Sequence, residues 1–493
     1  MAFLAPWEGM VRSLLSPAVV IERARSLSRP VIWGTAVYVS VVLFFAVAYL
    51  KSDSKQAFTL LAVSALGPLG IYGALRSPLI FPFCAYILFL PFESLSSLGS
   101  GGTLAKLLGV LTAGALLIRV VRRGCAIAPP GAVVAWAVLI LWMGISMFWA
   151  LDLRAAVGPF QMYASLVALF TLLAIVRVTS TEFNCVLGAI VTAGVISAGY
   201  DAYLYHSGQS LISANAGVSR VMITVGDASI DPNSLAAALV LPTALALYLL
   251  FNSRYLLISI MMFPALAILL LGFAASGSRG GFVDLGVVFF YLIVRSRHRL
   301  WLGGLMVVAI VTTVLANPGL PARFVDAQQD GGAGRRDIWH VGLYAFRDYW
   351  LTGAGVGNFP NAFDREYLNV YAQYVLGWHW AAHNVPLMIA TELGVIGFSI
   401  FVVAIIMQFR ILQKLAVADA RSFELRLVVE GAFLGTLVSG FSTSDLSAKY
   451  VWLSFSLMAL YRGYLLSRAT TRPFRAEPRR APTRRPIATR IGA

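Results

Sequence analysis

The sequence predicts an all-α polytopic membrane protein with about 12–14 transmembrane helices and one long outer loop. Hydrophobic residues make up 59% of the chain, charged residues make up 12%, and the mean hydropathy is +0.79. Runs of about 18 or more apolar residues, the length that crosses a bilayer, recur along the whole sequence. Only one long polar stretch, residues 317–383, interrupts them.

Fourteen apolar segments are candidate spans. They are residues 31–50, 57–75, 78–93, 103–120, 131–149, 158–176, 184–204, 233–251, 255–274, 281–294, 300–316, 384–408, 427–443 and 449–466. The third contains Pro82 and Pro91 and the tenth is short, so the expected number is 12 to 14. The three cysteines are scattered and indicate neither a disulfide framework nor a metal site.

Arginine clusters orient these segments. The clusters lie in residues 12–29, 119–123, 295–299 and 410–426, which all fall on the cytoplasmic side if residues 1–30 are cytoplasmic. Residues 31–316 then hold spans 1 to 11, residues 317–383 form the outer loop, and residues 384–466 hold spans 12 to 14. The composition of the basic tail, residues 467–493, favours disorder and contact with anionic membrane lipids. The net charge of +16 follows from topology, so we expect no nucleic-acid partner.

Three outward-facing segments end in signals for a helix start. Asp231-Pro232-Asn233 offers an Asp N-cap with Pro at the first helical position, Ser276-Gly277-Ser278 precedes Arg279, and Asn384 precedes Pro386. Each helix N-terminus carries roughly half a positive charge. Together with Arg220 and Arg279, these starts would form an anion site if they lie close together.

His383 stands where the polar loop meets the next apolar run, a position suited to proton chemistry at the membrane surface. A helix N-terminus beside it disfavours the imidazolium form. The alternative is a histidine that caps the helix or packs the loop. Arg279 can equally be an interfacial arginine, and Arg335 either binds sugar or phosphate or solvates the loop.

Several short motifs resemble the bacterial O-antigen ligase and O-antigen polymerase family, and they follow its order over about residues 140–400. They are Ser146-x-x-Trp149-Ala150-x-Asp152, Arg220 with Asp231-Pro232-Asn233, Ser278-Arg279-Gly280, Gly334-Arg335-x-x-Ile338-Trp339, Gly353-x-Gly355-x-Gly357-Asn358-Phe359, and His383-Asn384 with Glu392-Leu393-Gly394. Arg220 is followed by Val-Met-Ile, which departs from the small residue and glycine expected there.

The resemblance implies a membrane glycosyltransferase. We expect it to be metal-independent, because no acidic DxD pair or His/Asp cluster is available outside to hold a divalent ion, and to need no cofactor. The resemblance also implies that a glycan on undecaprenyl pyrophosphate is transferred, at the periplasmic face of the inner membrane, to the lipid A core, to another lipid-linked glycan or to a protein. By the resemblance, His383 would be the catalytic base, and Arg220 and Arg279 would bind the pyrophosphate. From its place in the loop we add Arg335 to the expected pyrophosphate site. Asn384, Asp231 and Asn233 would support these residues. We favour a ligase, because the few outer basic residues suit one pyrophosphate site; a polymerase is the alternative.

Two other kinds of protein compete with this interpretation. His379 and His383 have the helical i, i+4 spacing of a zinc pair, but Trp380 stands where a metalloprotease motif needs Glu. A polysaccharide transporter or flippase would also need many spans. The long outer loop that ends in a histidine favours an enzyme.

Overall fold

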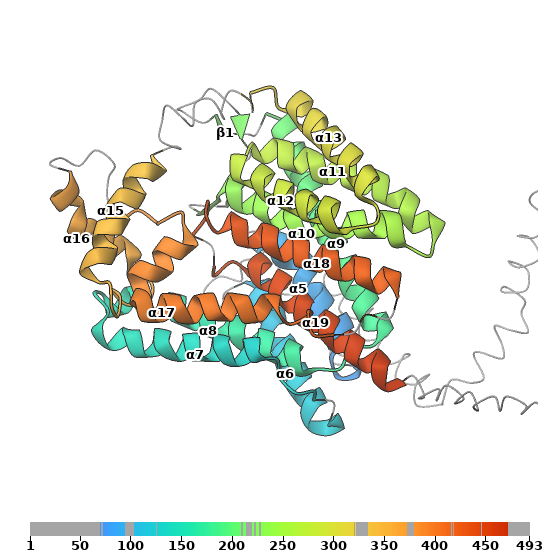
Figure 1. Ribbon diagram of the computed structural model, residues 1–493, viewed down its shortest axis with the longest axis horizontal. Helices are drawn as coiled ribbons and strands as arrows, with labels where there is room; N and C mark the ends of the chain where they lie inside the picture. The colour runs from blue at the N-terminus through green and yellow to red at the C-terminus, as the bar shows by residue number, and fades with distance from the viewer. Residues whose placement is uncertain are drawn as a thin grey trace, which may run out of the picture. The chain divides into compact units, whose positions relative to one another are not determined.

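A computed structural model describes residues 70, 72–93, 103–124, 126–208, 211–212, 219–220, 223–225, 228–319, 321, 334–371, 379–415, 417, 419–444 and 446–471. The chain divides into two compact units, Met1–Arg76 and Ser77–Ala493. All elements below belong to the second unit (Figure 1). The predicted N-terminal segment, the first predicted span, most of the second and most of the basic tail lie outside the described residues.

Helices dominate the second unit. In chain order they are α5 (Cys84–Phe89), α6 (Leu104–Arg123), α7 (Gly131–Ser146), α8 (Leu153–Ile175), α9 (Ser180–His206), α10 (Pro232–Asn252), α11 (Leu256–Ser276), α12 (Arg279–Arg295), α13 (Arg299–Ala316), α15 (Arg335–Asp348), α16 (Phe359–Val370), α17 (Val385–Phe409), α18 (Ala420–Ser439) and α19 (Lys449–Thr471). Short helical turns, η1 (Leu79–Phe83), η2 (Leu90–Phe92) and η4 (Met147–Trp149), complete them.

The polytopic all-α class is confirmed. Eight helices in the described part of the chain, α6 to α11, α13 and α17, are long and apolar enough to cross a membrane. Helices α12, α18 and α19 coincide with three further predicted segments. The predicted segment 78–93 is instead broken into η1, α5 and η2, with Pro82 inside η1 and Pro91 inside η2, because proline cannot continue the backbone hydrogen-bond ladder.

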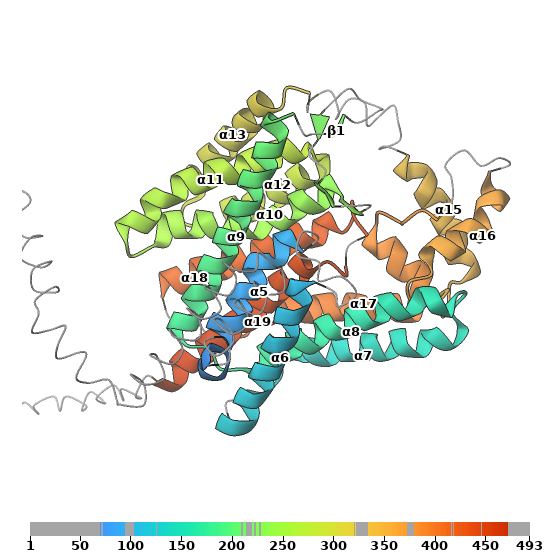
Figure 2. The same cartoon turned by 180° about the vertical axis from the view of Figure 1, so that it is seen from behind.

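Two groups of helices pack side by side in both views. Helix α10 contacts α9, α11, α12 and α18, while α17 lies along α7, α7 along α8, and α8 along α19 (Figures 1 and 2). Small residues allow close approach in the first group: a Cβ atom added to Gly272 would lie 2.6 Å from Ala198 Cβ, and one added to Gly281 would lie 2.3 Å from Ala236 Cβ. Such contacts are typical of helices that associate in membranes.

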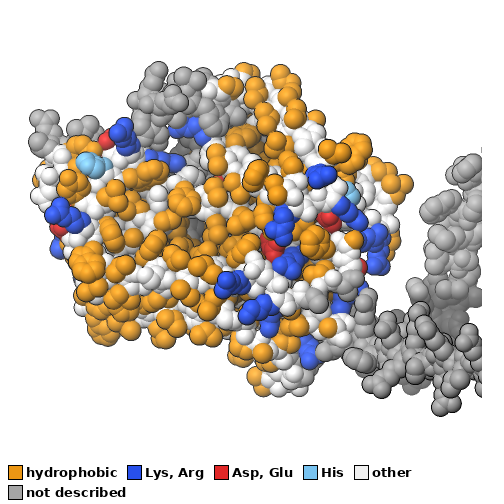
Figure 3. Space-filling view, viewed as in Figure 1, with side chains coloured by type: hydrophobic (Ala, Val, Ile, Leu, Met, Phe, Trp, Pro, Cys, Tyr) orange, Lys and Arg blue, Asp and Glu red, His pale blue; other side chains and the backbone are white. Residues whose placement is uncertain are grey.

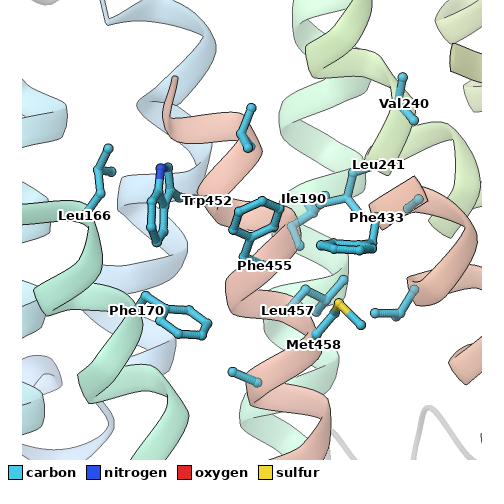
Figure 4. Packing of buried hydrophobic residues seen from close by; sticks show 14 of the residues in the cluster. Leu166, Phe170, Ile190, Val240, Leu241, Phe433, Trp452, Phe455, Leu457 and Met458 are labelled. Carbon is cyan, nitrogen blue, oxygen red and sulfur yellow. The ribbon is translucent and has the colours of Figure 1, made fainter. Parts of the chain in front are cut away.

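Aromatic side chains fill the core around α19. Phe455 lies between Trp452 and Phe433, with ring centroids 5.5 Å and 5.3 Å apart, and Phe170 of α8 meets Trp452 (Figure 4). Apolar side chains also cover much of the outer face of the helices, with Arg and Lys gathered in a few places (Figure 3). Leu300 is 85% exposed and Leu256 is 75% exposed. An apolar exterior of this kind suits lipid contact.

Two regions between the spans contain structure that we did not predict. Residues 211–230 contain two antiparallel hairpins, β1 (Leu211–Ile212) with β2 (Ser219–Arg220) and β3 (Ile223–Val225) with β4 (Ala228–Ile230). The long polar loop, residues 317–383, contains α15 and α16. Both are amphipathic: α15 buries Ile338, Val341 and Ala345, and α16 buries Phe359, Phe363 and Tyr367.

Candidate functional site

The three predicted helix starts are capped by the predicted side chains. Asp231 Oδ1 accepts a hydrogen bond from Asn233 N at 2.9 Å, and Ser278 Oγ accepts one from Gly281 N at 3.1 Å. Asn384 Oδ1 accepts one from Leu387 N at 3.0 Å. These bonds satisfy amide groups that a helix start leaves without an intrahelical partner. The N-caps of α10, α12 and α17 are therefore confirmed.

The starts of α10 and α12 are joined directly. Ser278 Oγ donates a hydrogen bond to Asn233 Oδ1 at 2.7 Å, and Asn233 Nδ2 donates to Asp231 Oδ1 at 2.9 Å. One chain of polar contacts thus runs from the cap of α10 to the cap of α12. The two motifs, 45 residues apart in sequence, meet at one place.

The turn after α18 joins α12 to α17. Gly280 lies against this turn, because a Cβ atom at Gly280 would come within 2.6 Å of Ser442 Oγ. Two residues further on, Ser444 Oγ accepts a hydrogen bond from His383 N at 2.7 Å. We call residues 440–444 the hydroxyl turn, since it contains Ser442, Thr443 and Ser444. It connects the backbone of His383 to the start of α12.

Arg335, the first residue of α15, lies within electrostatic range of the same cluster. Burial lowers the pKa of its guanidinium, the carboxylate of Asp231 opposes that shift, and the positive charge of Arg279 adds to it. Arg279 is itself the first residue of α12. Two half-buried arginines thus stand at two helix starts, with the carboxylate of Asp231 in electrostatic range of Arg335. Arginines and helix N-termini are both groups that favour an anion.

His383 has an unusual backbone that is held on both sides. Its φ is +45°, in the left-handed region that few side chains adopt. Its amide is bound by Ser444, and the carbonyl of the preceding Ala382 accepts a hydrogen bond from Trp339 Nε1 at 3.0 Å. Arg335 and Trp339 lie one turn apart on α15, so this helix links the arginine cluster to Ala382, the residue before the histidine.

His379 does not share the position of His383. Its φ is +58°, its side chain is 67% exposed, and it pairs with Asp364 of α16 through Nδ1 and through its amide at 2.8 Å. Neither histidine is in a helix, so the i, i+4 geometry that we considered for zinc was wrong. Within the described ranges no three His, Cys, Asp or Glu side chains cluster in a way that would hold a metal.

The glycine-rich motif is bound to α17 by its backbone. Gly355 N donates to the carbonyl of Glu392 at 2.8 Å, while Gly357 N and Phe359 N donate to the Glu392 carboxylate at 2.8 and 3.2 Å. Gly353, Gly355 and Gly357 all have positive φ, and a Cβ atom at Gly353 would lie 2.2 Å from Glu392 O. We call residues 353–359 with residues 391–394 the glycine bracket.

The bracket also fixes the junction of α7 and α8. Ser146 Oγ accepts a hydrogen bond from Val356 N at 3.1 Å, and Asn358 Oδ1 accepts one from Asp152 N at 2.8 Å. Asp152 Oδ1 caps α8 by accepting a hydrogen bond from Arg154 N at 2.8 Å. These two motifs therefore form hydrogen bonds with each other and fix the backbone of the long polar loop where the glycine-rich motif lies.

Arg220 lies in β2, where its backbone pairs with Leu211 of β1. That pairing does not bring it to the arginine cluster or exclude it from there, so its binding role stays a prediction.

The sequence did not identify Ser444 as the partner of His383, or Trp339 as the partner of Ala382, the residue before it. The only available signal was the run of three hydroxyl residues directly after an apolar segment.

These helices define a multi-pass membrane protein. Residues 264–402 match the family described as O-antigen ligase. The match confirms the resemblance found in the sequence and supports the O-antigen ligase and polymerase family; it includes Arg279, Arg335, the glycine bracket and His383. The match supports a function like that of an O-antigen ligase or polymerase, a family whose substrates are glycan–lipids. No curated protein matches the chain.

Proposed function

We propose that this protein is a glycosyltransferase that moves a glycan from undecaprenyl pyrophosphate to an acceptor hydroxyl at the periplasmic face of the inner membrane, as an O-antigen ligase does. One observation carries the proposal: Arg279, Arg335 and the starts of α10 and α12 meet at one place, and the hydroxyl turn connects that place to His383. An anion site and a base beside each other are what this transfer needs.

The reaction exchanges one bond for another at the first sugar carbon. The acceptor oxygen forms a bond to that carbon, the bond from the carbon to the phosphate oxygen breaks, and undecaprenyl pyrophosphate leaves with the electron pair. Arg279 and Arg335, with the helix N-termini, stabilise the negative charge that grows on the leaving group. His383, neutral at the start, takes the proton of the attacking hydroxyl.

The other predicted residues support this arrangement. Asn384, Asp231 and Asn233 hold the helix starts in position through the capping bonds. Arg220, in the segment that leads to α10, is proposed to add a third positive charge to the pyrophosphate site. No metal or cofactor takes part in the proposed reaction, because arginine forks supply the positive charge.

Transfer by the purified protein tests this chemistry. With undecaprenyl-pyrophosphate-linked glycan and an acceptor, the native protein should transfer the glycan, Arg279→Ala should not, and Arg279→Lys should recover little, since a point charge cannot replace a bidentate fork. Arg347→Ala, an exposed arginine at the other end of α15, is the matched control and should transfer normally. An active Arg279→Ala variant would remove this residue from the site.

The ligase and the polymerase differ in the acceptor, and a deletion strain separates them. A strain without a ligase should accumulate long polymerised glycan on undecaprenyl pyrophosphate, with none on the final acceptor. A strain without a polymerase should instead carry single repeat units on that acceptor. A transporter or flippase is the remaining alternative, and it predicts no transfer by the purified protein.

Cysteine labelling tests the proposed orientation. In a background without Cys84, Cys125 and Cys185, Asp330→Cys should react with an impermeant reagent from the periplasm. Leu415→Cys, after α17, should react only when the cytoplasmic face is opened. Reaction of both from one side would contradict the proposed topology.

A further inference from the structure

The peptide group that joins Ala382 to His383 is held at both of its polar atoms by side chains. Its carbonyl oxygen accepts a hydrogen bond from Trp339 Nε1 at 3.0 Å, and its N–H donates one to Ser444 Oγ at 2.7 Å. Trp339 belongs to α15, while Ser444 is the last residue of the hydroxyl turn. Two elements that are far apart in sequence therefore fix the plane of this one peptide group.

The backbone that follows this peptide group is strained. The φ angle of His383, +45°, lies in the left-handed region that residues other than glycine rarely adopt. Such a conformation costs free energy and persists only where the surroundings enforce it. Since φ is the rotation about the bond from the peptide nitrogen to Cα, the plane of the peptide group decides the direction in which the side chain leaves the backbone.

A further bond holds the chain on the other side of the histidine. Val385 N donates to the carbonyl of Gly440, the first residue of the hydroxyl turn, at 2.6 Å. Asn384 stands between Val385 and His383 and caps α17 with its own side chain. The Cα atom of His383 therefore lies between groups that are fixed on both sides, which keeps the backbone in its left-handed conformation.

Ser444 differs from the other two hydroxyl residues of the turn. Ser442 Oγ and Thr443 Oγ1 both donate to the carbonyl of Ser439 at 3.1 Å, at the end of α18. Ser444 instead accepts a hydrogen bond from another segment, 61 positions earlier in the chain. Its hydroxyl therefore serves His383, whereas its two neighbours serve the turn itself.

The elements that hold this peptide group also carry the arginine cluster. Arg335 lies one turn before Trp339 on α15, and Gly280, in the first turn of α12, lies against Ser442. A base must come within about 2.6–3.2 Å of the group whose proton it takes. A misplacement of about 1 Å can lower a rate by about 10²-fold. The bonds around the peptide group therefore set the position of the base relative to the proposed pyrophosphate site.

We infer that Ser444 is a positioning residue for the catalytic base, with Trp339 as its counterpart on the other side of the peptide group; the inference rests on the proposed function. Ser444 acts through the backbone of His383 and touches no substrate in this role. Loss of its hydroxyl should therefore slow the chemical step and leave the binding of the donor as it is.

Replacement of Ser444 by alanine tests this role. Because the acceptor oxygen is lost while the arginine cluster is intact, we expect kcat to fall by about 10–100-fold and KM for the undecaprenyl-pyrophosphate-linked donor to change by less than about twofold. The temperature of thermal unfolding should stay as in the native protein. Ser447→Ala removes a hydroxyl from the same connection between α18 and α19 and should transfer normally. A native kcat in Ser444→Ala, or a loss of thermal stability in its place, would overturn the inference.

A pair of β-branched variants isolates the hydroxyl of Ser444. Thr and Val have nearly the same shape, but only Thr keeps an oxygen that can accept the amide of His383. Ser444→Thr should keep most of the transfer activity, and Ser444→Val should lose as much as Ser444→Ala. Equal rates in the two variants would show that the hydroxyl does not position the base. This comparison holds even if the alanine variant folds poorly.

A double substitution separates positioning from a direct role. Asn at position 383 keeps the amide that Ser444 binds but has no base, so Ser444→Ala should slow the His383→Asn variant no further. Trp339→Phe, which removes the indole donor and keeps an aromatic ring, should lower kcat in the native background and again have no effect on His383→Asn. If either loss is as large in His383→Asn as in the native protein, the residue acts on something other than the base, and the inference fails.

The outcomes separate this inference from the proposed function. If the native protein transfers no glycan, the proposed function fails and the inference fails with it. If His383→Asn transfers as fast as the native protein, the assignment of the base fails. If the native protein transfers, His383→Asn is slow and Ser444→Ala is as fast as the native protein, only the positioning role is overturned.

Discussion

The cluster of helix starts and the glycine bracket both carry motifs of the family, yet the structure uses them in opposite ways. In the bracket, Glu392 and the backbone of residues 353–359 satisfy one another through hydrogen bonds. At the helix starts, Arg279 lies close enough to Arg335 for its positive charge to lower the pKa of the Arg335 guanidinium, while the carboxylate of Asp231 acts in the opposite direction. A motif whose polar groups bind one another stabilises the fold. A motif that places like charges near each other is a candidate binding site for a ligand of opposite charge. The comparison predicts opposite mutational behaviour in the two regions.

The largest effect is expected at His383. Asn tolerates the left-handed backbone at this position but cannot act as a base, so His383→Asn should lower transfer by about 10²–10⁴-fold while thermal stability stays unchanged. His379→Asn is the control, because His379 has the same backbone region and an exposed side chain. An equal loss of transfer activity in both variants would show that His383 is a structural residue of the loop and not the base.

The glycine bracket should show the reverse pattern. Gly353→Ala and Gly394→Ala would place a Cβ atom 2.2 Å from the carbonyl oxygens of Glu392 and Leu351, respectively. We expect the free energy of unfolding to fall by about 1–3 kcal/mol or more, with transfer per folded molecule kept. Thermal unfolding in detergent measures this. Gly303→Ala, in open space on α13, should not destabilise the protein; if it does so equally, the effect is not specific to the bracket.

A smaller effect that depends on pH is expected at Arg335. Burial lowers the pKa of a cation at this position, and the positive charge of Arg279 lowers it further. A cation with a lowered pKa is charged at low pH and loses its charge as the pH rises through that pKa. The ordinary pKa of arginine is so high that its side chain stays charged despite this shift, whereas the ordinary pKa of lysine is only about 10.4. Arg335→Lys should therefore transfer several-fold more slowly than the native protein at neutral pH and lose further activity as the pH rises toward about 9–10. A native-like pH profile of this variant would show that the cluster does not perturb position 335.

The smallest effect is expected from metal removal. Because arginines and helix N-termini are proposed to neutralise the pyrophosphate, EDTA should leave the initial rate of the purified protein unchanged. Restoration of activity by added Mg²⁺ after EDTA treatment would assign part of the charge stabilisation to a metal.

Features that depend on neighbouring residues could be predicted from the sequence. The apolar segments and the N-caps Asp231, Ser278 and Asn384 are examples, since a cap bonds an amide two or three residues away. Helices α15 and α16 were missed because they are short and amphipathic and lie in a polar region, where a search for long apolar runs does not detect them.

Long-range contacts could not be predicted in the same way. Ser444 and His383 are 61 residues apart, and Ser278 and Asn233 are 45 apart. No local pattern states that these residues meet, because the packing of whole helices brings them together. The likeness of the motifs to a family indicated a common order along the chain, but it did not indicate that the glycine-rich motif is hydrogen-bonded to Glu392.

The hydroxyl of Ser278 serves two helix starts at once, since it accepts from Gly281 of its own helix and donates to Asn233 of α10. The relative position of the two starts is therefore fixed before a ligand arrives. Ordering a residue costs about 1–2 kcal/mol of conformational entropy, and here that cost falls on folding. The association free energy of a diphosphate head group is then not consumed in assembling its own binding site.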